Sequence, residues 1–244
     1  MMLRRIANWT RFVLTEYSRS GRILIELTIT IALWGLFLQK YNTTTTQLFS
    51  LTGLFTMALA LYTTSSILSL GDRAQNYIVL TRPLGRRGFL LGLYCAAVLL
   101  VWAMGAIVIA LTAILNRPAG FGLPQLWYGS LPLLLNVALI SAVTLLLSSL
   151  VVRNLPRLLL LAVLAIALYS NTWNLSPVFR YLSPLQSLFS RLIQPAIAGQ
   201  RLAVSRDYTS GGLFVLVAQF ALSLLLVNLA LLSFGKRELI LGKK

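Results

Sequence analysis

The chain has 244 residues, of which 58% are hydrophobic and only 11% charged, whereas a soluble domain carries about 25% charged residues. Its apolar residues gather into runs long enough to cross a bilayer, because about 20 helical residues span the roughly 30 Å hydrocarbon layer. The composition therefore excludes a soluble globular domain and predicts an all-α polytopic membrane protein with one transmembrane domain over 1–244.

The chain is strongly basic, with 21 Lys and Arg against 5 Asp and Glu and a net charge of +16. In a soluble protein this balance would indicate nucleic-acid binding. In a membrane protein, basic residues gather in cytoplasmic loops and beside anionic lipid, so we expect membrane lipid and no nucleic acid as a partner. The absence of histidine excludes histidine-based zinc sites and catalytic triads. The single cysteine, Cys95, excludes a disulfide within this sequence.

Residues 1–22 alternate between apolar and polar side chains at helical spacing. Trp9 and Val13 fall on the apolar side, and Arg4 and Arg11 fall on the other. This pattern predicts an N-terminal amphipathic helix at the membrane interface, with a basic polar face and an anchoring role. Charge interleaved with the apolar residues, and the lack of a small-residue cleavage site, argue against a signal peptide.

Two apolar spans are expected next, at 23–39 and 48–70. Glu26 lies four residues after Arg22, a spacing that allows an ion pair across one helical turn. An acidic residue inside a span is a functional candidate by default, but the position of Glu26 near the end of the span favours a structural role. The second span is rich in Thr, Ser and Gly, which either pack helices closely or line a substrate path. The sequence leaves both interpretations open.

Segment 71–87 is a polar, basic island between two apolar runs. Its first part predicts a short helix that ends at Arg82, because a residue before proline disfavours the α conformation. A basic loop that holds orientation is one interpretation, but the apolar run at 77–80 is not needed for orientation, and exposed apolar side chains mark contact surfaces. We therefore expect a cytoplasmic docking surface for a soluble partner. Its predicted residues are Asp72, Arg73, Asn76, Tyr77, Ile78, Leu80, Arg82, Pro83, Arg86 and Arg87.

The third expected span, at 88–115, opens with small residues at Gly88, Gly92 and Ala96. Small residues at this spacing let a neighbouring helix approach closely. A turn-rich outer loop at 116–125 follows.

Three more spans are expected at 126–152, 158–172 and 211–234. The long segment 173–210 between the last two has apolar residues at helical spacing. It predicts an outer helix, amphipathic or re-entrant, that begins at Ser183 with serine as the cap and proline at the first helical position.

Six spans place both termini on the same side of the membrane. Fifteen of the 21 basic residues fall in four segments on that side, which are 1–22, 71–87, 153–157 and 236–244. The positive-inside rule therefore predicts a multi-pass plasma-membrane protein with the island and both termini in the cytoplasm.

The chain shows no sequence motif for catalysis or for ATP hydrolysis of its own. No G-x-x-x-x-G-K-[ST] phosphate-binding loop occurs, and we expect no catalytic residue, cofactor or metal site. Proton-coupled carriers need buried carboxylates or histidines, and here only Glu26 offers itself, beside the uncharged Asn136, Asn171, Gln219 and Asn228 in or near spans. The sequence therefore predicts a translocation body, not an enzyme, whose energy comes from another protein.

The island and the span after it read RAQNYIVLTRPLGRRGFLLG over 73–92. With six spans, a basic amphipathic N-terminal helix and a helix-containing outer segment, the chain resembles the ABC-2 type permeases of ABC transporters. The resemblance implies that 72–81 is a coupling helix seated in a groove of a separate ATPase subunit. It also implies a second permease copy or a related permease as partner, and export across a bacterial inner membrane. The residues on which this resemblance rests are Arg73, Leu80, Thr81, Arg82, Pro83, Arg86 and Gly92.

Two other classes of function are open from the residues alone. A non-transport membrane scaffold or assembly factor would use the same island to anchor a cytoplasmic partner. An intramembrane enzyme is disfavoured by the lack of histidine and of paired acids. The apolar interior permits a lipid-like or hydrophobic cargo but does not require one.

Overall fold

A computed structural model describes residues 2–39, 44–71, 85–118, 120–148, 150–151, 183–209 and 211–236. Four helices in these ranges are long and apolar enough to cross a membrane. They confirm a polytopic helical membrane protein and coincide with the second, third, fourth and sixth expected spans. The fifth expected span, at 158–172, lies outside the described residues. The four helices are α3 (Thr45–Gly71), α5 (Gly85–Leu115), α6 (Leu123–Leu146) and α9 (Gly212–Lys236).

The chain begins with two helices that meet at a sharp bend. Helix α1 is Met2–Arg19, and α2 (Arg22–Leu33) continues into a π-helical turn, η1 (Trp34–Leu38). The two arms are bent by 77° and together are long and apolar enough to form a fifth span. Gly21 permits the bend because its φ is +75°, a conformation that costs glycine little. The segment of the first expected span is therefore helical, but it qualifies as a candidate span only together with α1.

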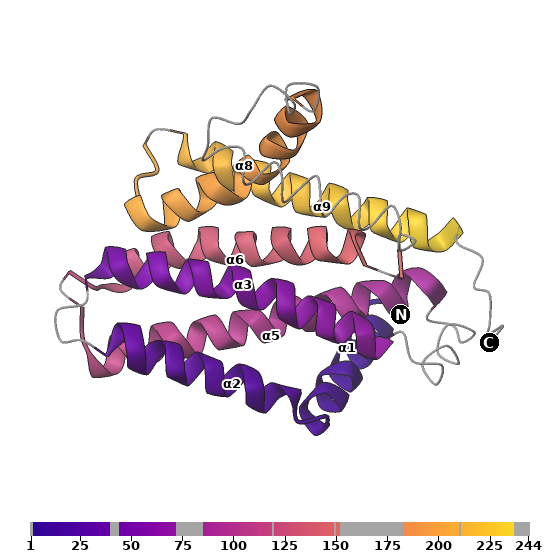
Figure 1. Cartoon of the computed structure of the whole chain (residues 1–244), viewed down its shortest axis with the longest axis horizontal. Coiled ribbons are helices and arrows are strands. Elements are labelled where there is room, and N and C mark those ends of the chain that lie inside the picture. Colours follow the sequence, from indigo (N-terminus) through magenta and orange to yellow (C-terminus); the bar gives the residue numbers. More distant parts are fainter. Residues whose placement is uncertain are drawn as a thin grey trace.

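Helices α3, α5, α6 and α9 run side by side (Figure 1). Helix α1 lies at the end of this bundle where α5 begins and α9 ends. Its amphipathic pattern is confirmed, but its apolar side packs against α5 rather than only against lipid: Trp9, Val13 and Tyr17 are buried. Leu3 and Phe12 are exposed on the outer side.

The polar face of α3 points into the protein. Thr52, Thr56, Thr63 and Thr64 are all buried, and the hydroxyl of Thr64 donates to Ser141 Oγ of α6 at 3.1 Å. Close helix packing, one of the two roles expected for these hydroxyl residues, is therefore realised along α3.

Helix α8 (Ser183–Ser205) confirms a helix within the segment before the last span. It carries Pro195 in its interior, which removes one backbone hydrogen bond and favours a bend; Figure 1 shows the helix changing direction. Beyond the proline, Ala196, Leu202 and Ala203 are buried where α8 packs against α3, α6 and α9. This half of the helix belongs to the bundle and does not lie free on its surface.

Candidate coupling site and buried polar contacts

Most of the predicted docking residues, from Asp72 to Pro83, lie outside the described part of the chain. Arg86 and Arg87 are described and form the first turn of α5. Arg86 donates from Nη1 to the backbone oxygen of Gly235, near the end of α9, at 3.3 Å. Arg87 is exposed. The exit of the island is thus tied to the last transmembrane helix.

An aromatic cluster lies one turn further along α5. The Trp9 indole of α1 donates from Nε1 to the backbone oxygen of Phe89 at 3.2 Å. The Trp9 and Phe89 rings stack with centroids 5.2 Å apart, and Phe89 stacks in turn on Phe234 of α9 at 6.5 Å. Three helices therefore meet on a single side chain, Phe89, four residues after α5 begins.

Close approach at this cluster depends on Gly92. A Cβ atom built there would lie 2.3 Å from Trp9 Cδ1, well inside van der Waals contact. The hydroxyl of Thr10 also donates to the backbone oxygen of Gly92 at 3.4 Å. The small-residue spacing in the third span correctly predicted close packing, and the structure identifies the partner as α1.

The end of α3, which precedes the island, is also held by tertiary contacts. A Cβ atom at Gly71, the last residue of α3, would lie 2.7 Å from Leu93 Cδ1 of α5. Arg22, at the start of α2, donates from Nη1 to the backbone oxygen of Ser66 at 3.1 Å and to its Oγ at 2.9 Å. It also donates to Ser69 Oγ at 3.2 Å. Arg22 thus binds the end of α3.

These contacts overturn the expected pairing of Arg22 with Glu26. The carboxylate of Glu26 is fully buried. Its Oε1 accepts from Tyr17 Oη at 2.5 Å and from Thr63 Oγ1 at 2.6 Å, while Oε2 has no hydrogen-bond partner. One side chain therefore joins α1, α2 and α3. Sequence reasoning singled out Glu26 but missed Tyr17 and Thr63, because neither lies at a helical spacing that would suggest a pair.

A second buried polar cluster lies among α6, α8 and α9. Gln219 donates from Nε2 to Asn136 Oδ1 at 2.7 Å, and Asn136 donates from Nδ2 to the backbone oxygen of Ala196 at 2.9 Å. A Cβ atom at Gly199 would lie 1.8 Å from Gln219 Nε2, so only glycine leaves room for this amide. Asn136 and Gln219 were recognised in the sequence as polar residues within spans, but not as partners.

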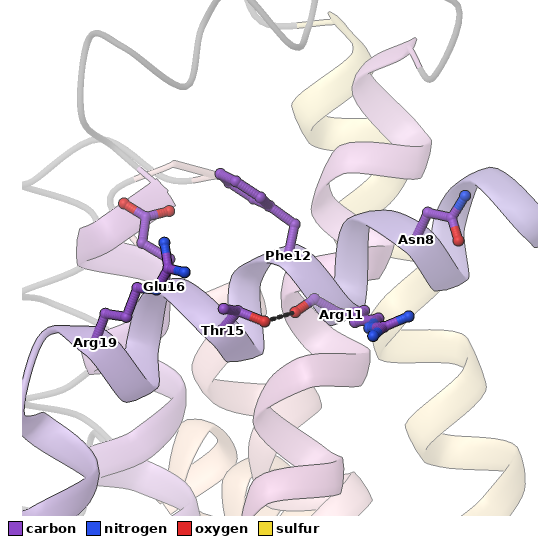
Figure 2. Close-up of a pocket in the computed structure, with 6 residues that line it drawn as sticks. All are labelled: Asn8, Arg11, Phe12, Thr15, Glu16 and Arg19. Carbon is purple, nitrogen blue, oxygen red and sulfur yellow. Dashed lines mark hydrogen bonds between the residues drawn. The ribbon is translucent and has the colours of Figure 1, made fainter.

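The outward side of α1 forms a shallow groove of about 680 Å³ (Figure 2). Arg11, Phe12 and Arg19 project from it, and Thr15 donates its hydroxyl to the backbone oxygen of Arg11 at 2.9 Å. Cationic side chains beside an exposed aromatic ring have the composition of a helix at a membrane interface. The groove is lined by Asn8, Arg11, Phe12, Thr15, Glu16 and Arg19.

Across the described residues, no group of three or more His, Cys, Asp and Glu side chains could hold a metal ion. The described residues of the site connect neighbouring helices to one another. The helices on either side of the island are held to α1, α2 and α9 by hydrogen bonds, stacked rings and close contacts at glycine. Compared with protein-family models, curated proteins and solved structures, the chain matches none.

Proposed function

We propose that this chain is the membrane-spanning permease subunit of an ATP-driven exporter. ATP is hydrolysed by a separate nucleotide-binding subunit that docks on segment 71–87, and a second permease copy or a related permease completes the pathway. The resemblance of 73–92 to ABC-2 type permeases supports this assignment.

One observation carries the proposal, which is the convergence of α1, α5 and α9 on Phe89. A partner that displaces the island moves the start of α5. Because Phe89 stacks on both Trp9 and Phe234, and Arg86 holds the end of α9, such a displacement is transmitted to the rest of the bundle. A loop that only fixed orientation would not need its exit anchored to two other helices.

The transport cycle then needs two arrangements of the bundle that the ATPase state selects, since a partner shifts a conformational equilibrium only by binding its two states differently. In this cycle the ATPase subunit, docked on the island, directly displaces α3 and α5. The buried pair of Gln219 and Asn136 holds α9 to α6. The start of α1 and the end of α9 lie at the same end of the bundle (Figure 1), as expected if both termini are cytoplasmic in a bacterial inner membrane.

The first test is biochemical. The full chain is expressed with candidate ATPase subunits encoded beside it, and the purified complex is assayed for vanadate-sensitive ATP hydrolysis. Arg82→Glu combined with Tyr77→Ala should abolish both association and stimulated hydrolysis. Arg201→Glu is the matched charge reversal on exposed surface of α8 and should leave both unchanged. Unaltered association in the island variant would refute docking there.

A second variant separates docking from transmission. Phe89→Leu keeps an apolar side chain but removes both ring stacks. We expect the ATPase to bind normally while its stimulation by the permease falls severalfold. If no ATPase associates with the wild-type chain, the exporter assignment fails, and a membrane scaffold or assembly factor becomes the better description.

A separate experiment tests which side of the membrane the island and the expected outer loop face. In a Cys95→Ser background, a cysteine introduced by Gln75→Cys should react with a membrane-impermeant maleimide only after the membrane is opened. A cysteine introduced by Arg117→Cys, in the expected outer loop, should react in intact cells. The reverse labelling pattern would overturn the proposed topology.

A further inference from the structure

An apolar pocket of about 400 Å³ lies between α3, α5 and α6. Its volume falls within the range of about 300–1,000 Å³ that is usual for small-molecule sites. The walls are almost entirely hydrocarbon, including Val101, Ile109 and Leu133. Glu26, Asn136 and Gln219 are not among the described residues that line it, so none of the contacts described above accounts for the pocket.

The polar side chains of the pocket are not equivalent. The hydroxyl of Thr56 donates to the backbone oxygen of Gly53 at 3.1 Å, and that of Ser130 donates to Leu126 at 2.5 Å. Thr52 also lines the pocket and is fully buried, but its Oγ1 has no hydrogen-bond partner.

Several other threonines in the helices donate their hydroxyl to a backbone oxygen on the preceding turn of the same helix. Thr30, Thr112 and Thr144 each donate to the backbone oxygen four residues before them, at 2.6–2.8 Å. Thr52 does not make this bond. An unpaired hydroxyl in a hydrocarbon environment costs free energy that one external hydrogen bond would recover.

The pocket also has an opening to the outside of the protein. Ala106 and Ala110 line it and are exposed on α5. Helix α5 is long and apolar enough to cross a membrane, so the mouth lies on the exposed face of a candidate membrane-spanning helix. Trp102 lines the wall, and its indole donates to the backbone oxygen of Leu134 at 3.1 Å.

We propose that this pocket binds one slim, single-chain amphiphile that carries a single hydrogen-bond acceptor. The acceptor meets the hydroxyl of Thr52, and the apolar chain fills the space between α5 and α6 and leaves through the mouth at Ala106 and Ala110. A charged headgroup is excluded from the interior, because the described side chains that line the pocket carry no charge to pair with it.

The probe for this site is the methyl ester of a mid-chain brominated fatty acid, added to the full chain in phospholipid nanodiscs. Bromine quenches tryptophan fluorescence at short range, and Trp102 lies in the wall. We expect a saturable quenching component that disappears in Trp102→Phe. A brominated alkane of equal length, which has no acceptor, should bind more weakly than the ester.

Thr52→Val removes the hydroxyl while nearly preserving the shape of the side chain. It should weaken ester binding about threefold to tenfold, the range expected for loss of one hydrogen bond, and leave alkane binding unchanged. Ala110→Phe, at the exposed mouth, should abolish saturable binding of both probes. Thr144→Val is the control, because the hydroxyl of Thr144 is already bonded to Ile140 within α6.

Three outcomes overturn the proposal. The first is quenching that rises without saturation. The second is equal ester binding by wild type and Thr52→Val. The third is quenching by brominated bilayer phospholipid that the free ester cannot displace, which would make a bilayer acyl chain the occupant. The assay uses no ATPase, so its result is independent of whether the exporter assignment holds.

Discussion

The contact between α1 and α5 offers the sharpest test of how this bundle is held together, and Gly92→Ala is the perturbation. The added methyl group would lie 2.3 Å from Trp9 Cδ1. The indole cannot simply turn away, because its Nε1 is bonded to Phe89 and its ring stacks on that residue. Either the hydrogen bond is lost or α1 moves off α5.

The magnitude follows from these two routes. Overpacking a well-filled contact costs about 1–3 kcal/mol, and loss of one hydrogen bond costs about 0.5–1.5 kcal/mol. We therefore expect Gly92→Ala to lower the free energy of unfolding by about 2–3 kcal/mol. Trp9→Ala, which removes the buried ring itself, should cost about 3–5 kcal/mol.

A double-mutant cycle checks that the two residues act through one contact. If the methyl group clashes only with the indole, Gly92→Ala should cost almost nothing in the Trp9→Ala background, giving a coupling energy of about 2–3 kcal/mol. Unfolding is followed by circular dichroism during titration with SDS in mixed micelles, so that loss of a tryptophan does not disturb the signal.

Gly35→Ala is the matched control, because a Cβ atom at Gly35 would meet no atom within 4 Å. Its effect should be neutral or slightly stabilising, since alanine is the better helix former. The reasoning is refuted if Gly92→Ala is equally costly with and without the Trp9 ring, or if Gly35→Ala destabilises as much as Gly92→Ala.

Three further predictions concern the polar groups. Glu26→Gln keeps an acceptor for both hydroxyl donors and should change the unfolding free energy little, whereas Glu26→Leu leaves both donors unpaired and should cost about 2 kcal/mol or more in the same SDS titration. Asn136→Leu removes two hydrogen bonds and Gln219→Leu removes one, so the first should be the more destabilising, with about 1 kcal/mol expected for each bond. Hydrogen bonds from Thr209 lower the pKa of Asp207. Because the pKa of Asp207 is lower in the folded state, its carboxylate stabilises the fold above the unfolded-state pKa, and this stabilisation is lost as the pH falls through the folded-state pKa. The Thr209 amide resonance should therefore shift at acid pH in the wild type and stay fixed in Asp207→Asn.

The spans were predictable because each rests on a local property. Runs of apolar residues identified α3, α5, α6 and α9, and the alternation of polar and apolar side chains identified α1. The spacing of small residues at Gly92 indicated close packing for the same reason. These signals need no knowledge of which helix lies beside which.

The polar contacts were not predictable in the same way, because they depend on how helices approach one another. Glu26 takes its partners from residues 9 and 37 positions away, although a basic residue sits one turn before it in the same helix. Arg22 prefers the end of α3, where a backbone oxygen and two serine hydroxyls converge. Local spacing proposed an ion pair, and tertiary packing separated its two members.

The contact between Trp9 and Phe89 joins residues 80 positions apart, and this separation constrains how the protein is made. The ribosome delivers α1 and α2 long before α5 exists, so the indole has no acceptor and Glu26 lacks Thr63 until α3 follows. During that interval the apolar side of α1 has no helix to pack against, and an amphipathic helix can bury that side in the membrane interface. The polar face of α1 thus lets this helix remain at the membrane surface until α5 has been synthesised and can pack against it.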